Sequence, residues 1–355
     1  MNSRERVLAA VRHQQPDRVP VGVGLCPEIL GKLRAHLALP DDEAVWAWTG
    51  HDFSWVGPRF RHPASDIGYA DPTIEVTADG LYLDIFRVPF KVVQTEFQRY
   101  VDIAGRPPLK AAQTLVDIAR FPWPDAADWD YSTIADRLGA CRRASIGHSR
   151  GFFEISHFVR GMDEFLMDLA MDEPMAHAVM DHIIAFLLEK VRRTFEAAGQ
   201  GGYAVFEYND DVASQRALFI SPEMWRRDIK PRMAKFCEMY HRFGAVVRYH
   251  SCGSVRSIIP DLIEIGVDIL NPVQPLAAGM DPFELKREFG PHLTLDGGMD
   301  IQDFLIHASP AQVRDHTKRM IEVLGRDGGF ILSGSHTLQA DTPVENVVAM
   351  FEAAR

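Results

Sequence analysis

SPEMWRRDIKPRMAKFCEMYHRFGAVVRYHSCG, at residues 221–253, decides the fold class of this 355-residue chain. A helical pattern over 222–243 leads into a short apolar run over 245–249. Ser221 followed by Pro222 is typical of a helix start, because the fixed φ of proline suits the first helical position. A short apolar run bounded in this way is typical of a buried strand. The stretch therefore predicts one helix–strand unit of an α/β fold.

The same unit repeats along most of the chain. Further helical patterns lie near 161–170, 176–197, 255–264, 282–289, 310–324 and 343–353. Eight apolar runs are expected as strands, at 18–23, 53–56, 144–147, 203–207, 245–249, 267–270, 293–296 and 329–332. This alternation predicts parallel strands with helical crossovers, and eight of them predict a single (β/α)8 TIM barrel domain over 1–355. An open doubly wound sheet is the alternative, but no Gly-x-Gly-x-x-Gly follows the first strand.

Two segments fall outside this alternation. An N-terminal helical extension is expected to begin after Ser3 as its N-cap, with Val7 and Val11 on one apolar stripe. Residues 60–130 are expected to form an irregular insertion that covers one end of the barrel. Within it, alternating β-branched and aromatic residues over 81–85 and 88–93 predict a hairpin or meander.

Composition excludes several classes of function. The net charge of −11 makes nucleic acid and anionic membrane surfaces poor partners, because both require clustered Lys and Arg. Four cysteines imply no disulfide framework and favour a reducing cytoplasm. The sequence shows neither a signal peptide nor an apolar run long enough to span a membrane. We therefore expect a cytoplasmic protein that acts on a small molecule.

The predicted strand ends carry most of the polar residues with chemical potential. Active sites of such barrels lie at the C-terminal ends of the strands. Glu207, Asp210 and Asp211 follow the fourth strand, and further polar side chains follow later ones. The other strand-end candidates are Glu154, Asn271, Gln274, Asp296 and His336. We expect these side chains to form one binding site.

The sharpest local feature is His250-Ser251-Cys252. Side chains two residues apart at a strand end point to the same side, and imidazole and thiolate suit zinc. His336 is the first choice as third ligand, while Glu154, Asp210, Asp211 and Glu207 compete for the remaining position. An isolated His-x-Cys is a weak signal. Cys252 could equally be a small buried residue, His336 a hydrogen-bonded pocket histidine, and the Asp210–Asp211 pair a loop cap.

Several motifs resemble the uroporphyrinogen decarboxylase-like superfamily. They are Arg4-Glu5-Arg6-Val7, Pro16-Asp17-Arg18-Val19-Pro20, Asp210-Asp211, Ser221-Pro222-Glu223, His250-Ser251-Cys252-Gly253, Asp268 to Gln274, Asp296-Gly297-Gly298 and Thr342 to Asn346. The true decarboxylases of this superfamily need no metal and carry Met-Arg-Gln-Ala-Gly-Arg after the first strand. Here 21–26 reads VGVGLC, without an arginine to pair with substrate carboxylates.

The chain is more similar to the zinc-dependent methyltransferase branch, which works with corrinoid proteins. That branch has His-x-Cys at the fifth strand, matched by His250 and Cys252, and a Cys where this chain has His336. The resemblance implies bound Zn2+ and methyl transfer between a small substrate, either a methoxylated compound or a thiol, and a corrinoid (cobalamin). No Asp-x-His-x-x-Gly corrinoid motif is present, so a separate corrinoid protein is the expected partner. A homodimer is one expectation for the oligomeric state.

The resemblance also implies roles for individual residues. Asp210, Asp211 and Glu207 are the expected catalytic groups, with an aspartate as proton donor or acceptor. The expected substrate-binding residues are Asn271, Gln274, Gln339, Asp296, Phe153 and Trp55, of which the two aromatic ones would wall the pocket.

Two other functions remain open from the sequence. One is a metal-free decarboxylase for a small carboxylated substrate, in which Asp52 loosely matches the catalytic aspartate and Arg59 or Arg248 lies in the pocket. The other is a non-catalytic binding protein, which the intact polar ring at the strand ends disfavours.

Overall fold

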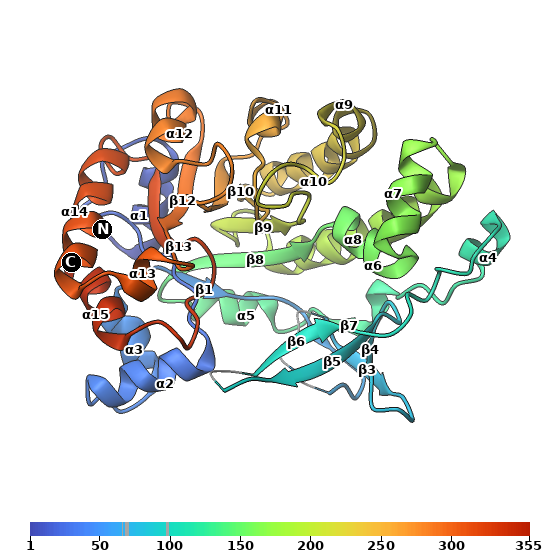
Figure 1. Ribbon diagram of the computed structural model, residues 1–355, viewed down its shortest axis with the longest axis horizontal. Coiled ribbons are helices and arrows are strands. Elements are labelled where there is room, and N and C mark those ends of the chain that lie inside the picture. The colour runs from blue at the N-terminus through green and yellow to red at the C-terminus, as the bar shows by residue number, and fades with distance from the viewer. Residues whose placement is uncertain (66, 68–70, 97–98) are drawn as a thin grey trace.

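A parallel sheet forms the centre of the protein. The computed structural model describes residues 1–65, 67, 71–96 and 99–355 (Figure 1). The sheet has the order β1-β8-β9-β10-β11-β12-β13, and all neighbouring strands are parallel. These strands are β1 (Phe53–Trp55), β8 (Ala144–Arg150), β9 (Val205–Asn209), β10 (Val246–His250), β11 (Ile269–Val273), β12 (Thr294–Met299) and β13 (Phe330–Gly334). The predicted α/β class with a parallel sheet is confirmed.

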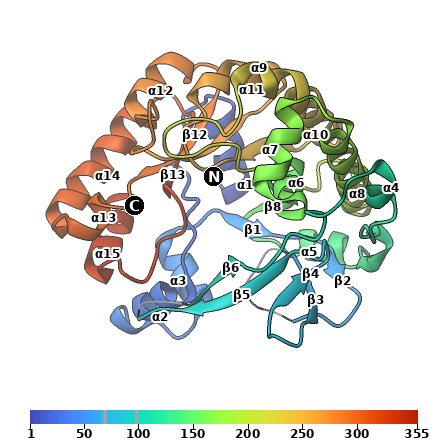
Figure 2. The same ribbon diagram turned by 45° about the vertical axis from the view of Figure 1, so that its right-hand side comes forward.

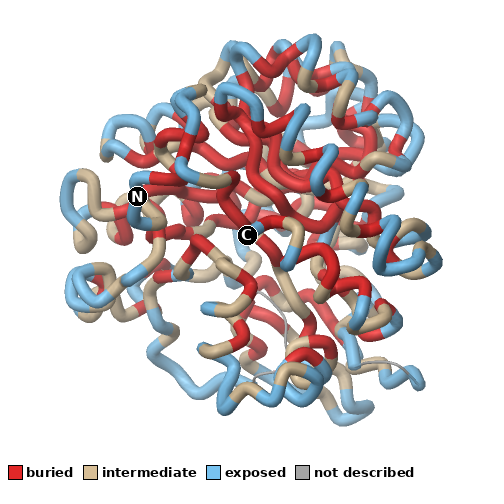
Figure 3. The backbone as a smooth tube through the Cα atoms, turned by 90° about the vertical axis from the view of Figure 1, so that its left-hand side faces the viewer, coloured by how far each residue is buried: buried red, intermediate tan, exposed pale blue. Residues whose placement is uncertain are grey.

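Helices surround the curled sheet on its outer side (Figure 2). They are α1 (Ser3–Val11), α2 (Pro27–His36), α3 (Asp42–Thr49), α4 (Leu115–Ala119), α5 (Ile134–Gly139), α6 (Phe152–Arg160), α7 (Met162–Ala170), α8 (Pro174–Ala198), α9 (Pro222–Met224), α10 (Lys230–Arg242), α11 (Ile259–Glu264), α12 (Pro282–Phe289), α13 (Phe304–His307), α14 (Pro310–Leu324) and α15 (Val344–Ala353). Figure 3 shows the buried backbone gathered in the centre and exposed segments at the rim. None of the helices in the described part of the chain combines the length and apolar character that crossing a bilayer requires.

Side chains cap several helix starts, as predicted for Ser221. The side chains of Ser221, Asp281 and Ser309 each accept a hydrogen bond from a backbone amide in the first turn. The expected continuous helix over 222–243 is instead interrupted by a π-helical segment, Trp225–Ile229. Pro231 is the second residue after this segment and has no N–H to donate, which explains a local change in the hydrogen-bond pattern.

The prediction of a strand at 18–23 is wrong. Val21 makes only isolated parallel bridges, to Leu332 on one side and to His51 on the other. A longer ladder cannot form, because Pro20 has no N–H and the Val21 N–H donates to the carboxylate of Asp52 (3.0 Å). The two edges of the sheet, at β1 and β13, therefore meet through the single residue Val21. A complete eight-stranded barrel is not confirmed.

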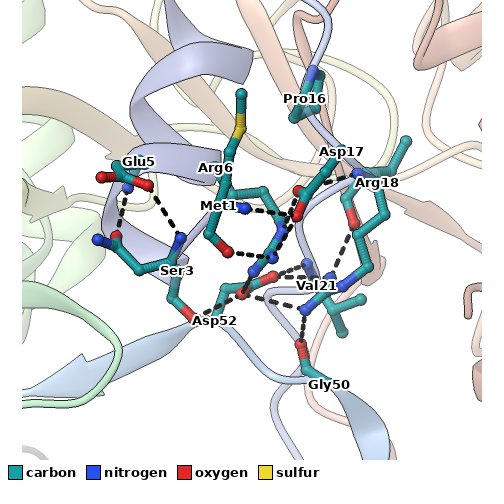
Figure 4. A network of polar contacts seen from close by, with 12 residues as sticks. Met1, Ser3, Glu5, Arg6, Pro16, Asp17, Arg18, Val21, Gly50 and Asp52 are labelled. Atoms are coloured by element: carbon teal, nitrogen blue, oxygen red, sulfur yellow. Dashed lines mark hydrogen bonds and ion pairs between the residues drawn. The ribbon is translucent and has the colours of Figure 1, made fainter.

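A network around Asp52 holds this junction (Figure 4). The buried Asp52 carboxylate accepts hydrogen bonds from Arg6 (2.7 Å), Arg18 (2.9 Å) and Ser3 (2.8 Å). The Ser3 hydroxyl is therefore not the helix cap that we expected. Asn2 is the cap, since its side chain accepts from the Glu5 amide while the Glu5 carboxylate accepts from the Asn2 amide. The network fastens α1 and the following segment beneath the sheet.

The region between β1 and β8 carries a second, antiparallel sheet. Its strands are β3 (Thr73–Val76), β4 (Tyr82–Asp84), β5 (Pro89–Gln94) and β6 (Arg99–Ile103), and a separate pair joins β2 (Arg59–Phe60) to β7 (Trp129–Asp130). The antiparallel pairing of β4 with β5 confirms the expected hairpin. Of the expected 60–130 insertion, residues 66, 68–70 and 97–98 lie outside the described residues.

Candidate active site

The register of the parallel strands sorts the inward side chains into levels. Ile146, Val205 and Val246 are cross-strand neighbours and form an apolar level, against which Val7 and Val11 of α1 pack. Because side chains repeat their direction every two residues, the next level differs sharply. It brings together His148, Glu207 and Arg248. The level above holds Arg150, Asn209, His250 and Asn271. The interior thus changes from apolar to charged within one step.

A pocket of about 280 Å³ opens above the apolar level. Its lining includes Trp55, Glu207, Arg248, Asn271 and the two histidines of the predicted metal site, His250 and His336. Pockets for drug-sized ligands measure ~300–1,000 Å³. The pocket therefore suits only a small molecule.

Three predicted ligands meet at the edge of this pocket. The side-chain ligand atoms of His250, Cys252 and His336 all lie within 4.8 Å of one another. Nε2 of His250 is 3.8 Å from Sγ of Cys252. Two ligands of a tetrahedral zinc ion stand roughly 3.4–3.6 Å apart, given the usual Zn–N and Zn–S bond lengths. The donor set and its spacing fit a zinc ion with a fourth position left for another ligand.

Asn271 orients the first of these ligands. Its Oδ1 lies 2.6 Å from Nδ1 of His250, so the amide oxygen accepts a hydrogen bond from the Nδ1–H. This contact places the proton on Nδ1 and leaves the Nε2 lone pair directed towards Cys252. Histidines that bind metals are commonly held by such a second contact. Burial lowers the pKa of His336, and the neighbouring His250 lowers it further, which favours the neutral ring that a metal requires.

The environment of Cys252 opposes a free thiolate. Burial raises the pKa of its thiol, and the nearby carboxylates of Asp211 and Glu154 raise it further. Asp211 approaches closely, since its Oδ1 accepts a hydrogen bond from the Cys252 amide (2.7 Å). A metal cation would reverse this balance, because coordination deprotonates a thiol. The acidic surroundings therefore favour a divalent cation over a free nucleophilic cysteine.

Asp210 does not face this cluster. Its carboxylate accepts hydrogen bonds from the backbone amides of Glu154 (2.7 Å) and Phe153 (3.2 Å) and from the Tyr208 hydroxyl (3.0 Å). These amides open α6, whose N-cap residue is Gly151 and offers no side chain. Asp210 thus caps α6 from another strand end, and burial raises the pKa of its carboxyl to about 7.

Glu207 and Asp296 lie on either side of Arg248 at the bottom of the pocket. Arg248 Nε is 2.8 Å from Asp296, and its Nη1 contacts the Glu207 carboxylate. All three side chains are buried. Burial opposes ionisation of Glu207, but Arg248, His250 and His148 together outweigh it, so the pKa of Glu207 lies below its usual value. Burial raises the pKa of Asp296 in spite of the same guanidinium.

The structure separates the remaining predicted residues. Trp55 lines the pocket and is about half exposed. Phe153 is fully buried against His157 and Phe165, away from the pocket lining. Gln274 accepts from the Gly253 amide and donates to the Ser335 carbonyl, so it ties two strand-end loops together. Gln339 donates to the Thr337 carbonyl.

Glu154 stands beside the metal cluster without joining it. Its carboxylate is 3.0 Å from Nη2 of Arg150, which also pairs with Asp71. Among the described residues, the group of ligand atoms within 4.8 Å contains the two histidines and Cys252 only. The fourth ligand that we expected from Glu154 therefore remains a prediction.

The sequence analysis missed His51, which also lines the pocket. It precedes β1 and belongs to no motif, so only its spacing from Phe53 and Trp55 could have suggested that it faces inward. A second group of potential ligands, Asp172, His177 and Asp228, lies elsewhere, with Asp172 exposed and Asp228 buried. Arg227 pairs with both of its aspartates, so this group already has its counter-charge.

The comparison with family models identifies the chain. The model described as "Uroporphyrinogen decarboxylase (URO-D)" matches residues 110–355, more than two thirds of the sequence. The chain belongs to the uroporphyrinogen decarboxylase family. The expected resemblance to this family is confirmed.

Individual relatives within the family are distant. A uroporphyrinogen decarboxylase from Anaeromyxobacter sp. (strain Fw109-5) is 22% identical over 254 residues, which cover 67% of this chain and 66% of the relative, just under two thirds of its length. A methyltransferase from Methanosarcina mazei superposes with a TM-score of 0.66 at 18% identity, covering 100% of this chain and 98% of that one. The second comparison shows that the whole chain shares the fold of that methyltransferase.

Three residues were expected to act in a decarboxylase, and two of them, Asp52 and Arg59, do not line the pocket. Asp52 is fully buried in the ion-pair network below β1. Arg59 is exposed on β2. Arg248 does line the pocket, but it is held by Glu207 and Asp296.

Proposed function

We propose that this member of the family is a zinc-dependent methyltransferase. It would transfer a methyl group between a small substrate, either a methoxylated compound or a thiol, and a corrinoid carried by a separate protein. The observation that carries the proposal is the meeting of His250, Cys252 and His336 at one edge of a small pocket. Three neutral or anionic N and S donors with an open fourth position are typical of a catalytic zinc site.

Zinc bound there would lower the pKa of a thiol acceptor or polarise the oxygen of a methoxyl group. The residues of the chain have complementary tasks. Asp211, beside Cys252, is placed to hold or release a proton next to the substrate. Trp55 supplies an aromatic wall, and Asn271 keeps the ring of His250 in one orientation. The corrinoid is proposed to come from a partner, because the chain lacks a corrinoid-binding motif of its own.

The metal-free decarboxylase gains no specific support. Asp52 has each carboxylate oxygen occupied by arginine, hydroxyl or amide donors, and it is fully buried. A tetrapyrrole with eight carboxylates needs several cations and a large cavity. Arg248 is the single Arg or Lys among the described residues lining the 280 Å³ pocket.

We also propose that the curled sheet works as a (β/α)8 barrel over residues 1–355, with 20–22 in the place of the eighth strand. The hydrogen bonds of this segment to Leu332 and the bridge from Val21 to His51 support that reading.

The first test is the zinc content of the purified chain after extensive dialysis. We expect about one zinc per chain in the wild type and none in Cys252→Ser, because the variant loses the thiolate ligand. Cys141→Ser is the matched control: Cys141 is partly buried but lies outside the cluster, and the variant should keep its zinc. Stoichiometric zinc in Cys252→Ser would overturn the ligand assignment.

The second test addresses the reaction itself. Zinc-loaded protein should transfer methyl groups between thiols or methoxylated compounds and a corrinoid protein, and His336→Ala should lose the transfer together with the metal. A chain that binds no zinc even after anaerobic reconstitution would contradict the proposed function.

A further inference from the structure

His250 is flanked by two asparagines at its own level of the sheet. Asn209 of β9 pairs with it on one side, and Asn271 of β11 pairs with it on the other. Neighbouring strands lie about 4.8 Å apart, so both residues stand one strand spacing from the predicted metal ligand. The Oδ1 of Asn271 accepts a hydrogen bond from Nδ1 of His250 (2.6 Å). Asn271 is therefore committed to holding the ring of His250.

The side chain of Asn209 faces the interior of the curled sheet. Asn209 follows Glu207 by two residues on the same strand, and side chains two residues apart point the same way. The Glu207 carboxylate contacts Arg248 at the bottom of the pocket. Tyr208, between them, points the other way, since its ring packs against Phe236 of α10 with the centroids 5.0 Å apart. Asn209 therefore lines the pocket with its side chain.

The amide of Asn209 is free for a ligand. Within the described part of the chain it makes no hydrogen bond, although Asn209 is only partly exposed. The neighbouring polar side chains of the lining are already paired. Glu207 contacts Arg248, and the ring of His250 is held by Asn271. An amide carries a carbonyl acceptor and two N–H donors, so it matches a ligand group that can both donate and accept.

We infer that Asn209 selects the substrate by a hydroxyl group close to the reacting atom. The inference rests on the proposed function, since it places the methylated oxygen or sulfur at the open position beside His250 and Cys252. A hydroxyl a few bonds away would lie beside Asn209 and could donate to its Oδ1 or accept from its Nδ2. A substrate with an alkyl group in that place would leave the amide unpaired, which is what discriminates against it. The pocket of about 280 Å³ accommodates a small molecule of this kind.

The experiment uses two thiol probes of nearly equal size, 2-mercaptoethanol and 1-propanethiol, which differ by a hydroxyl in place of a methyl group. Zinc in the purified full chain is replaced by cobalt(II), whose absorption spectrum reports thiolate binding without methyl transfer. Dissociation constants of both probes are measured in the wild type and in Asn209→Ala. The ratio of the two constants, propanethiol over mercaptoethanol, should fall about three- to tenfold in the variant, because the hydroxyl loses one hydrogen bond.

Thr337→Val is the matched control. Thr337 lines the same pocket, and its hydroxyl, which lies beside Gly24, makes no hydrogen bond within the described part of the chain. The variant removes this hydroxyl at almost constant volume and should keep the wild-type ratio. A lost preference in Thr337→Val, with Asn209→Ala unchanged, would assign the hydroxyl contact to Thr337 and overturn the inference.

Metal content is measured first on every preparation. Asn209→Ala should bind cobalt as the wild type does, because Asn209 is not one of the three clustered ligands. A wild-type chain that binds no metal would overturn the proposed function and this inference together. Metal-loaded proteins with equal ratios in the wild type and in Asn209→Ala would overturn the inference alone and leave the proposed function standing.

Discussion

Oδ1 of Asn271 lies 2.6 Å from Nδ1 of His250, and this contact settles which nitrogen of the histidine faces Cys252. Asn271 is on β11 and His250 on β10, at paired positions of the two parallel strands. The pairing is therefore built into the sheet. The strand register therefore holds the His250 ring in one orientation, as the proposed zinc site requires.

Asn271→Ala should weaken zinc binding about 10- to 100-fold, because the ring of His250 loses the contact that fixes its orientation. The dissociation constant can be measured by competition with a chromophoric chelator. Asn209→Ala is the matched control: Asn209 lines the same pocket and is paired with His250 across the strands, but within the described part of the chain its side chain makes no hydrogen bond to His250. Equal zinc affinities in the two variants would show that the Asn271 contact has no effect on the site.

Arg248→Met should lower the free energy of unfolding by about 3–5 kcal/mol, because it leaves the buried carboxylates of Glu207 and Asp296 without their cation. Urea unfolding measures the loss. Arg192→Met removes exposed ion pairs on α8 and should cost at most about 1 kcal/mol. Equal unfolding free energies of the two variants would show that the buried ion pairs of Arg248 do not stabilise the fold.

Asp52→Asn should destabilise the protein by about 3–5 kcal/mol while leaving zinc binding intact. The charge that Arg6 and Arg18 share is lost, but the metal ligands are untouched. Urea unfolding and zinc content are measured on the same preparation. Normal stability together with lost activity would instead assign Asp52 a catalytic role and favour the decarboxylase.

Asp210 should make stability depend on pH in an unusual direction. Burial raises the pKa of its carboxyl to about 7 from an ordinary 3.8, so the folded state holds this proton more tightly than the unfolded state. The contribution is complete below about pH 4 and is lost as the pH rises towards 7. The difference in unfolding free energy between wild type and Asp210→Asn should therefore fall over that range.

Asp163 serves as the control for this measurement. Its hydrogen bond with Lys110 lowers the pKa of its carboxyl, so its contribution changes only below about pH 4. The difference between wild type and Asp163→Asn should stay flat from pH 4.5 to 7.5. A flat difference for Asp210→Asn as well would contradict the raised pKa.

Three of the predicted ligands lie together in the structure, for reasons that the sequence carries. His250 and Cys252 are two residues apart at a strand end, so one local rule places both side chains. His336 follows the last strand of a parallel sheet, whose strand ends all meet at one edge. These three positions depend on the two-residue repeat of side-chain direction along a strand and on the order of the strands. Both can be inferred from a sequence. Their geometry in the structure matches that expectation.

Other positions depend on partners that no local pattern reveals. The Val21 N–H donates to Asp52, a residue 31 positions away, so a segment with good strand composition does not become a strand. Asp210 looks like a catalytic acid until the bare start of α6 is seen to need a cap. Phe153 was expected to wall the pocket, but it lies in the first turn of α6, and its side chain is buried in the core. Each case depends on a partner that is distant in the sequence.

The junction at Val21 also bears on how the edges of the sheet are protected. An open sheet exposes two rows of unpaired backbone groups, and such edges recruit strands from other molecules. Here one short segment pairs with Leu332 of β13 and with His51 just before β1, and the Val21 N–H donates to Asp52. Removal of residues 1–22 should expose the unpaired backbone groups at both edges of the sheet, at β1 and at β13. We therefore expect the N-terminal segment to protect the protein from aggregation through these edges.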